Sequence, residues 1–300
     1  MKILLFGKNG QVGWELQRSL APLGEVVALS SSSQELCGDL LRFDDVRQTI
    51  QSVAPDVIVN AVAYTAVDKA ESDAEQADIL NVQAPALLAQ EAKQRDICLI
   101  HYSTDYVFNG ASDKPYNETD LPDPLNVYGN SKLQGENNVI ASGCEYLIFR
   151  TSWVYAAHGN NFIKTILRLS QQREKLSIVN DQIGAPTGAE LIADVTAHTV
   201  RTLKSQSAVS GLYHLTAKEY TSWYEFAEFI LRYVEREHAY FTKPPSQLIA
   251  IPSTDYPVPA KRPLNSRLDT SKLEQTFGLS LPNWRSGVLR VLDEILTLKI

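Results

Sequence analysis

The sequence KILLFGKNGQVG, residues 2–13, decides the fold of this chain. It begins with a short apolar run that is typical of a buried strand, and Gly7, Gly10 and Gly13 follow directly. Glycines at a strand-to-helix turn let backbone N–H groups approach a pyrophosphate, and the dipole of the next helix favours the anion. The spacing is GxxGxxG rather than GxGxxG, so a glycine-rich turn without a ligand is the alternative. The position after the first strand favours a dinucleotide site.

Short apolar runs alternate with amphipathic segments through the first half of the chain. The runs lie at 2–7, 25–29, 56–61, 97–103 and 146–150, and the helical patterns at 12–22, 44–53, 72–94 and 127–142. Strand and helix in alternation imply right-handed crossovers, with helices on both faces of a parallel sheet. The sequence therefore predicts a doubly wound, Rossmann-like α/β fold, with a dinucleotide-binding domain over residues 1–150.

Residues 151–300 have a less regular pattern, which predicts a smaller α/β substrate-binding lobe. Its expected helices are 160–172, 188–203, 223–236, 270–277 and 284–298, and its expected strands are 176–180 and 211–215. A segment near 185–215 is expected to return to the main sheet. The proline-rich stretch 243–263 is interpreted as a long loop that forms a lid or wall of the substrate site.

Composition limits the classes of partner. The 35 acidic and 28 basic residues give a net charge of -7 without a basic run, so neither nucleic acid nor an anionic membrane is an expected partner. The first apolar run is too short for a signal sequence or a membrane span. Cys37, Cys98 and Cys144 are far apart and lack zinc-site spacing, which indicates reduced thiols in a cytoplasm.

The end of the second expected strand bears on the choice of cofactor. Dinucleotide folds usually place an acidic residue there for the ribose hydroxyls, whereas this chain has four serines from Ser30 to Ser33. A serine can bond a ribose hydroxyl without repelling a 2′-phosphate, and Lys8 can offer that phosphate a positive charge. We therefore expect use of both NADH and NADPH. Asp39 is expected at the adenine edge of the site, with a turn cap as its alternative role.

Tyr128 and Lys132 form the one YxxxK pair of the chain, at the start of an expected helix. At i and i+4 they share a helix face, where an ammonium lowers the pKa of a tyrosine from its usual value of about 10. Thr104 and Asp105 end the fourth expected strand, where open α/β sheets bind ligands. A chance match on a helix surface is the alternative, but the combination favours a proton donor and its tuning charge.

At this point the chain resembles the extended short-chain dehydrogenase/reductases, and in particular the branch that reduces nucleotide sugars. The resemblance covers nearly the whole chain. It rests on GKNGQVG (7–13), NAVAYTAVDKAE (60–71), YSTDYVFNG (102–110), PLNVYGNSK (124–132), RTSWVYA (150–156), NDQIGAPT (180–187) and RPLNSRLDT (262–270). Ala156 stands where the family usually has glycine, a small departure that leaves the chemistry intact.

The resemblance implies reduction of the 4-keto group of dTDP-4-dehydro-L-rhamnose, which supplies rhamnose for surface polysaccharide such as O antigen. Tyr128 would donate the proton, Lys132 would tune Tyr128 and bond the nicotinamide ribose, and Thr104 would bond the carbonyl oxygen. Asp105 and Trp153 would hold the sugar, and a core tryptophan is the less favoured alternative for Trp153. The residues expected to bind the cofactor are Gly7, Asn9, Gly10, Gln11, Val12, Gly13, Ser30, Asp39, Leu40, Ala63, Tyr64, Thr65, Tyr128 and Lys132.

Other expectations concern the diphosphate, a metal and the assembly. Arg262 and Arg267 are candidates for the substrate diphosphate, because forked guanidinium donors suit phosphate oxygens, and exposed loop arginines are the alternative. The histidines show no metal spacing. Glu190 and Asp194 form an acidic pair that is ordinarily a solvated helix face. The resemblance implies a homodimer and leaves room for Mg²⁺ at a subunit contact.

Three alternatives within related folds differ in what they require. Sugar dehydratases have an Asp-Glu pair after the threonine, and Tyr106 stands here in place of the glutamate, which argues against elimination. An epimerase uses the same tyrosine and lysine but keeps NAD bound during turnover. A non-catalytic regulatory subunit, as in the family that partners methionine adenosyltransferase, is disfavoured because Thr104, Tyr128 and Lys132 are all present.

Overall fold

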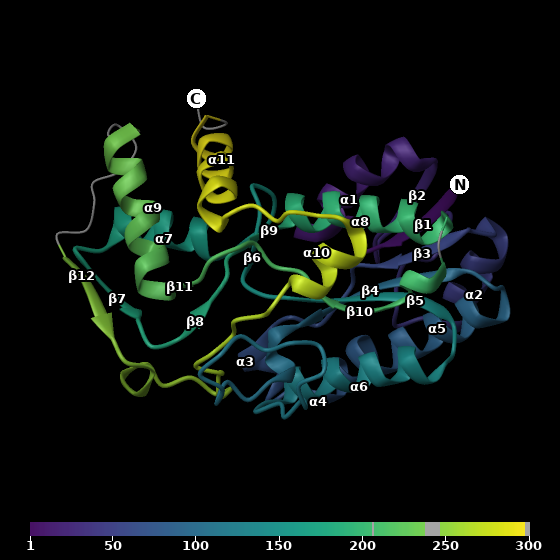
Figure 1. Cartoon of the computed structure of the whole chain (residues 1–300), viewed down its shortest axis with the longest axis horizontal. Helices are drawn as coiled ribbons and strands as arrows, with labels where there is room; N and C mark the ends of the chain where they lie inside the picture. Colours follow the sequence, from purple (N-terminus) through teal and green to yellow (C-terminus); the bar gives the residue numbers. More distant parts are fainter. Residues whose placement is uncertain (206, 238–246, 298–300) are drawn as a thin grey trace.

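A six-stranded parallel sheet forms the centre of the molecule (Figure 1). The computed structural model describes residues 1–205, 207–237 and 247–297. The strands of the sheet are β1 (Lys2–Phe6), β2 (Glu25–Leu29), β3 (Val57–Asn60), β4 (Cys98–Thr104), β5 (Glu145–Thr151) and β10 (Gly211–His214). Their order is β10-β5-β4-β3-β1-β2, and every pairing is parallel. The doubly wound α/β prediction is confirmed.

Helices cover both faces of the sheet because each has one apolar side. On one face lie α1 (Gln11–Leu20) and α8 (Ala189–Ser205), and on the other lie α2 (Phe43–Val53), α5 (Ala84–Gln94) and α6 (Val127–Ala141). Leu16 and Ile192 are fully buried against the first face, and Ile50 and Leu88 against the second. Each such side chain contributes about 1.5–3 kcal/mol by leaving water.

The helix predicted over 72–94 is divided in the structure. It consists of α4 (Ala74–Asp78), a π-helical turn η2 (Ile79–Gln83) and α5. Pro85 has no backbone N–H to donate to the carbonyl of Asn81, which interrupts the α-helical hydrogen bonds at this point. Separately, the Asn81 side chain bonds both the N–H and the carbonyl of Tyr64. The predicted helical segment is present from Ala74 to Gln94, and only its internal π turn, a feature that is frequent at functional sites, was not predicted.

The second lobe packs α7 (Phe162–Gln172), α9 (Trp223–Glu237) and α11 (Trp284–Thr297) around an aromatic-rich core. Three two-stranded sheets also belong to this half: β6 (Val154–Tyr155) with β9 (Thr187–Gly188), β8 (Ile183–Gly184) with β11 (Thr221–Ser222), and β7 (Lys175–Val179) with β12 (Gln247–Ile251). The remaining elements are α3 (Val67–Ala70), α10 (Ser271–Phe277), and the short helical turns η1 (Ala21–Leu23), η3 (Asp105–Val107), η4 (Ser207–Val209) and η5 (Ser253–Asp255).

Two predictions for this half need correction or restriction. The stretch 243–263 is not entirely a loop, because β12 within it pairs in parallel with β7. Its first residues, 243–246, lie outside the described residues, as does position 298 at the predicted end of α11. The segment that forms β10 does join the central sheet, beside β5.

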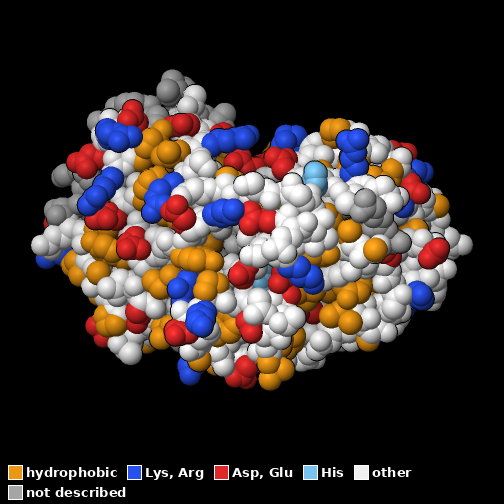
Figure 2. Space-filling view, viewed as in Figure 1, with side chains coloured by type: hydrophobic (Ala, Val, Ile, Leu, Met, Phe, Trp, Pro, Cys, Tyr) orange, Lys and Arg blue, Asp and Glu red, His pale blue; other side chains and the backbone are white. Residues whose placement is uncertain are grey.

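The charge distribution agrees with the acidic composition. Figure 2 shows acidic and basic side chains interspersed over the visible face, without a large area of one sign. No helix in the described part of the chain is long and apolar enough to span a membrane.

Candidate active site

The glycine loop lies at the carboxyl ends of β1 and β3, where the strand order reverses direction. Gly7 has a φ of +92°, which favours glycine. A Cβ at Gly13 would lie 2.0 Å from the carbonyl oxygen of Gly7, so only glycine lets α1 begin this close to the loop. Gly10 gives α1 no capping side chain. The first N–H groups of α1 therefore remain available to an anion, as a bound pyrophosphate requires.

A cavity of about 390 Å³ adjoins this loop. Seven of the residues predicted to bind the cofactor line it: Gly7, Asn9, Gly10, Ser30, Asp39, Leu40 and Ala63. Six further residues line it without having been predicted: Ser31, Gly38, Leu41, Ala61, Val62 and Leu80. The apolar members gave no signal in the sequence beyond core packing. The size and lining of the cavity fit the adenosine half of a dinucleotide.

Asp39 takes the turn-cap role that was the alternative, and its contact with adenine stays a prediction. It lines the cavity, and its Oδ1 accepts a hydrogen bond of 3.1 Å from the backbone N–H of Leu41. Ser30 is buried at the base of the serine turn, where the Ser33 hydroxyl accepts from its N–H.

The other predicted cofactor residues lie beside the cavity rather than in its lining. Gln11, Val12 and Gly13 form the first turn of α1. Tyr64 is held by Asn81, whose Oδ1 accepts from its N–H at 2.9 Å, and Thr65 is exposed next to it. Asn81 therefore fixes the loop after β3, a role that sequence reasoning missed.

The start of α6 places Tyr128 and Lys132. Asn126 caps the helix, with its Oδ1 accepting from the N–H of Gly129 at 2.7 Å. A Cβ at Gly129 would lie 2.2 Å from the carbonyl oxygen of Tyr106, so glycine lets α6 pack against the turn after β4. Both Tyr128 and Lys132 are buried on this first part of the helix.

Tyr128 is a neutral phenol in the protein alone. Burial raises its pKa to about 12, and an interaction with Thr104 opposes this increase. The expected lowering requires Lys132 together with a bound cationic nicotinamide, whereas in the chain alone desolvation by burial is the largest effect and raises the pKa. A group that retains its proton at neutral pH is suited to donate it to a carbonyl oxygen.

Asp105 and Thr104 lie beside Tyr128 at the end of β4. The Thr104 hydroxyl donates to Asp105 Oδ1 at 3.1 Å and accepts from the N–H of Tyr106 at 3.2 Å. Burial raises the pKa of Asp105 to about 6, and hydrogen bonds from Ser266 and Thr104 oppose this. The three predicted polar side chains of this site are thus brought together.

Lys132 points into the sheet. Its Nζ donates to the carbonyl of Tyr102 at 2.7 Å and lies 3.5 Å from Nε2 of His101. Burial lowers the pKa of Lys132 to about 8, and the charge of Glu136 opposes this. Sequence reasoning missed His101, because one histidine inside a buried strand has no recognisable pattern.

Trp153 follows β5 and contacts Trp223, which lines a second cavity. Its φ of 49° is strained, and its ring stacks on Trp223 with centroids 3.5 Å apart. A cavity of about 550 Å³ adjoins Trp223 and is lined by basic, aromatic and polar side chains that include Phe162, Arg173, Lys175, Gln182, Tyr256 and Arg262. Arg262 also pairs with Asp68 at 2.7 Å. Arg267 does not line this cavity and bonds Asn265 and the Asp113 carbonyl.

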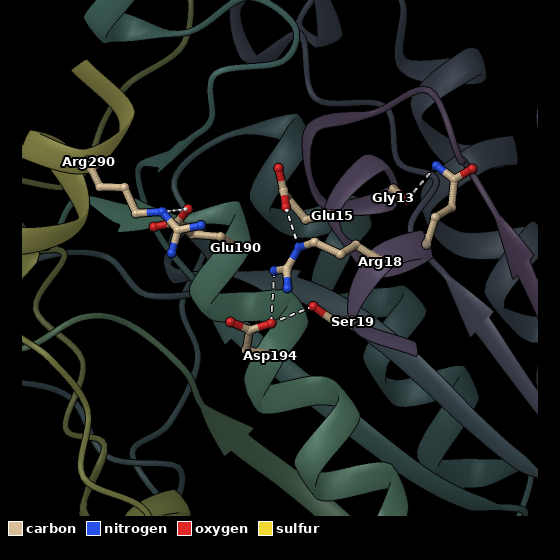
Figure 3. A network of polar contacts seen from close by, with 8 residues as sticks. Gly13, Glu15, Arg18, Ser19, Glu190, Asp194 and Arg290 are labelled. Atoms are coloured by element: carbon tan, nitrogen blue, oxygen red, sulfur yellow. Dashed lines mark hydrogen bonds and ion pairs between the residues drawn. The ribbon is translucent and has the colours of Figure 1, made fainter. Parts of the chain in front are cut away.

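The acidic pair on α8 is engaged with arginines (Figure 3). Asp194 accepts from Arg18 at 2.9 Å and from Ser19, and Glu190 lies 3.3 Å from Arg290. Among the described residues no group of three or more His, Cys, Asp or Glu is arranged to hold a metal ion.

Comparison with known proteins gives consistent results. Residues 1–297 match the family model "RmlD substrate binding domain". The chain is 52% identical over 297 residues to the dTDP-4-dehydrorhamnose reductase of Escherichia coli K12, covering 99% of both chains. A solved dTDP-4-dehydrorhamnose reductase from Clostridium acetobutylicum superposes with a TM-score of 0.88 at 33% identity, covering 100% of both chains. One from Bacillus anthracis in complex with NADP has a TM-score of 0.86 at 32% identity, covering 98% of this chain and 99% of the other.

Proposed function

The chain belongs to the RmlD family of dTDP-4-dehydrorhamnose reductases, and on this premise we propose that it reduces dTDP-4-dehydro-L-rhamnose to dTDP-L-rhamnose with NAD(P)H. The observation that carries the proposal is the buried, protonated Tyr128 beside Thr104. Thr104 ends β4, and one strand, β3, separates β4 from β1, which leads into the glycine loop. The product is a donor of rhamnose for surface polysaccharide.

The nicotinamide, when bound, supplies the hydride to carbon 4 of the sugar. Tyr128 holds the proton that the carbonyl oxygen needs, and the Thr104 hydroxyl offers that oxygen a hydrogen bond. Lys132 lies one turn after Tyr128, and its ammonium form would stabilise the phenolate left after proton transfer. Trp153, at the boundary of the two lobes, provides an apolar surface for the sugar ring.

The cavity beside Trp223 is the proposed binding site for the dTDP group. Arg262, Arg173 and Lys175 supply positive charge for a diphosphate, and Phe162 and Tyr256 supply aromatic faces for a base. Arg267 is less suited to this role, because its guanidinium is already bonded to protein carbonyl oxygens.

Use of both NADH and NADPH is the finer part of the cofactor proposal. The serine turn after β2 offers hydroxyls to a ribose and places no carboxylate against a 2′-phosphate. We expect values of kcat/KM for the two cofactors that differ by less than a hundredfold. A larger preference for either would contradict this expectation.

The reaction itself is tested by following NAD(P)H oxidation with a panel of 4-keto nucleotide sugars that differ in base and configuration. Turnover should be fastest with dTDP-4-dehydro-L-rhamnose. Cofactor binding without oxidation by any 4-keto sugar would instead favour a regulatory subunit. Turnover without net cofactor oxidation would favour an epimerase.

Tyr128→Phe tests the role of the phenol directly. The variant should lose two to four powers of ten in kcat, the usual contribution of a general acid, and keep its affinity for NADPH. Tyr116→Phe is a matched control, since this buried hydroxyl bonds Asn109 and the backbone of Ser112 rather than Thr104. Near wild-type turnover of Tyr128→Phe would remove Tyr128 from its role.

The homodimer implied by the family, and Mg²⁺ at its contact, are the finer part of the assembly proposal. Sedimentation velocity in magnesium and in EDTA tests both. Two chains in magnesium and one in EDTA would support the pair of proposals. A dimer in both conditions would support the homodimer alone, and the ion pairs of Glu190 and Asp194 with arginine favour this second result.

A further inference from the structure

Three buried polar side chains form a row behind the catalytic tyrosine. Asn60 ends β3, His101 lies on β4 and Lys132 lies on α6, and each is at most 1% exposed. Asn60 Nδ2 is 3.2 Å from His101 Nδ1, and His101 Nε2 is 3.5 Å from Lys132 Nζ. We propose that Asn60 and His101 are positioning residues that hold an imidazole N–H against the amine of Lys132 and so set how firmly Lys132 keeps its proton.

The backbone fixes the orientation of the Asn60 amide. The N–H of Val62 donates to Asn60 Oδ1 at 3.1 Å. Rotation of the amide by half a turn would bring its NH₂ group against that N–H, two donors face to face. Asn60 therefore presents its NH₂ group, and never its oxygen, to the imidazole of His101.

The orientation of the amide determines the tautomer of His101. An NH₂ group can only donate, so Nδ1 of His101 must accept and carries no proton. The neutral ring then carries its one proton on Nε2, which faces Lys132. The second proton is excluded, since burial and the charge of Lys132 hold the pKa of His101 well below its usual value.

An N–H directed at Nζ favours the amine of Lys132 over the ammonium. The amine can accept from Nε2–H and still donate to the Tyr102 carbonyl, whereas the ammonium has no lone pair to accept with. Burial acts in the same direction, and the combination makes Lys132 a group that exchanges its proton near neutral pH.

The other charged and titratable groups near Lys132 are few. On α6 these are Tyr128, one turn before it, and Glu136, one turn after it, and Arg150 of β5 bonds Glu136 bidentately. At the end of β4 and the following turn lie Asp105 and Tyr106. The Glu136 charge favours the ammonium and is neutralised by Arg150 at 2.6 Å, which leaves His101 as the polar contact that disfavours it.

Histidine tautomers can be read in the unmodified full chain by ¹⁵N NMR with labelled histidine. The described residues contain two buried histidines, and the structure predicts opposite tautomers for them. His101 should carry its proton on Nε2, and His214 on Nδ1, which donates to the Tyr116 carbonyl at 3.1 Å. The signal that is lost in His101→Phe belongs to His101, and this assigns the signals of the two buried histidines. A proton on Nδ1 of both rings overturns the proposal.

A pH profile tests the consequence for Lys132 and rests on the proposed reductase function. In Asn60→Asp the carboxylate still accepts from Val62 and now accepts from Nδ1–H, which turns the Nε2 lone pair toward Lys132. Lys132 should then keep its proton to higher pH, and the alkaline limb of kcat/KM should move up by about one pH unit. Asn138→Asp, the same change on α6 without contact to His101, should leave the limb in place.

A variant without the His101 imidazole distinguishes an effect of the His101 tautomer on the alkaline limb from a direct effect of the new carboxylate charge. Asn60→Asp combined with His101→Phe should leave the limb where His101→Phe alone places it. An equal shift in that background would assign the effect to the new carboxylate and overturn the proposal. If the chain fails to reduce any 4-keto sugar, the proposed function falls while the NMR result still decides the tautomer.

Discussion

At the scale of single residues, the burial of Asp105 lowers the stability of the folded protein when the carboxyl group is ionised. Its pKa of about 6 lies above the unfolded value of 3.8, so the folded protein binds more protons than the unfolded chain between these values. Stability contributed by protonated Asp105 is therefore lost as pH rises through this window.

Asp105→Asn should reveal this cost. The difference in unfolding free energy between variant and wild type should move in favour of the variant from pH 4 to pH 6, by about 2 kcal/mol. Denaturant unfolding across this range measures it. A difference in unfolding free energy that does not change with pH would show that burial does not raise the pKa of Asp105.

Lys132 is also buried at a cost. Its pKa of about 8 lies below the ordinary lysine value of 10.5, so the folded protein binds fewer protons than the unfolded chain between these values. The penalty is present in full below pH 8 and is relieved as pH rises toward 10.5.

Lys132→Met should therefore retain or raise the melting temperature at pH 7 while kcat falls at least about a hundredfold. Calorimetry and a turnover assay on the same preparation measure both. A variant that unfolds readily would indicate that Lys132 is mainly structural.

The predictability of individual residues depended on their spacing. Tyr128 and Lys132 are recognisable because i and i+4 positions share a helix face, and Thr104 because it ends a strand. Asn60 and His101 are not, because their contacts join β3, β4 and α6 across about 70 residues of sequence and only the folded sheet aligns them.

At the scale of elements, the approach of α1 to the glycine loop is the contact that shapes the cofactor cavity. Gly13→Ala would place a Cβ 2.0 Å from the Gly7 carbonyl, and backbone must move to admit it. Affinity for NADPH should fall at least about tenfold, a loss of about 1.4 kcal/mol. Gly211→Ala is the control, since its nearest contact would be an ordinary 3.6 Å. Equal affinities in titration calorimetry would contradict this role of Gly13.

Elements with strong periodicity were predicted well, and those that depend on partners were not. The five strands of the first half and the long helices follow from apolar patterns alone. The two-residue strands β6, β8, β9 and β11 are too short to have a pattern, and β12 exists because β7 lies beside it. The π turn at 79–83 depends on Pro85 and on the loop that Asn81 holds.

At the scale of the whole molecule, the chain places a dinucleotide cavity beside β1 and β3 and a basic, aromatic cavity in the second lobe. Thr104 ends β4, and Tyr128 lies beside it at the start of α6. This arrangement suits a hydride donor on one side and a nucleotide sugar on the other, with the proton donor where they meet.

The most direct test of this account is the fate of a labelled hydride. Turnover of dTDP-4-dehydro-L-rhamnose with NAD(P)H that carries deuterium at both positions of nicotinamide carbon 4 should give dTDP-L-rhamnose with one deuterium at carbon 4 of the sugar, measured by NMR and mass spectrometry. A sugar product without deuterium at carbon 4 would contradict the account.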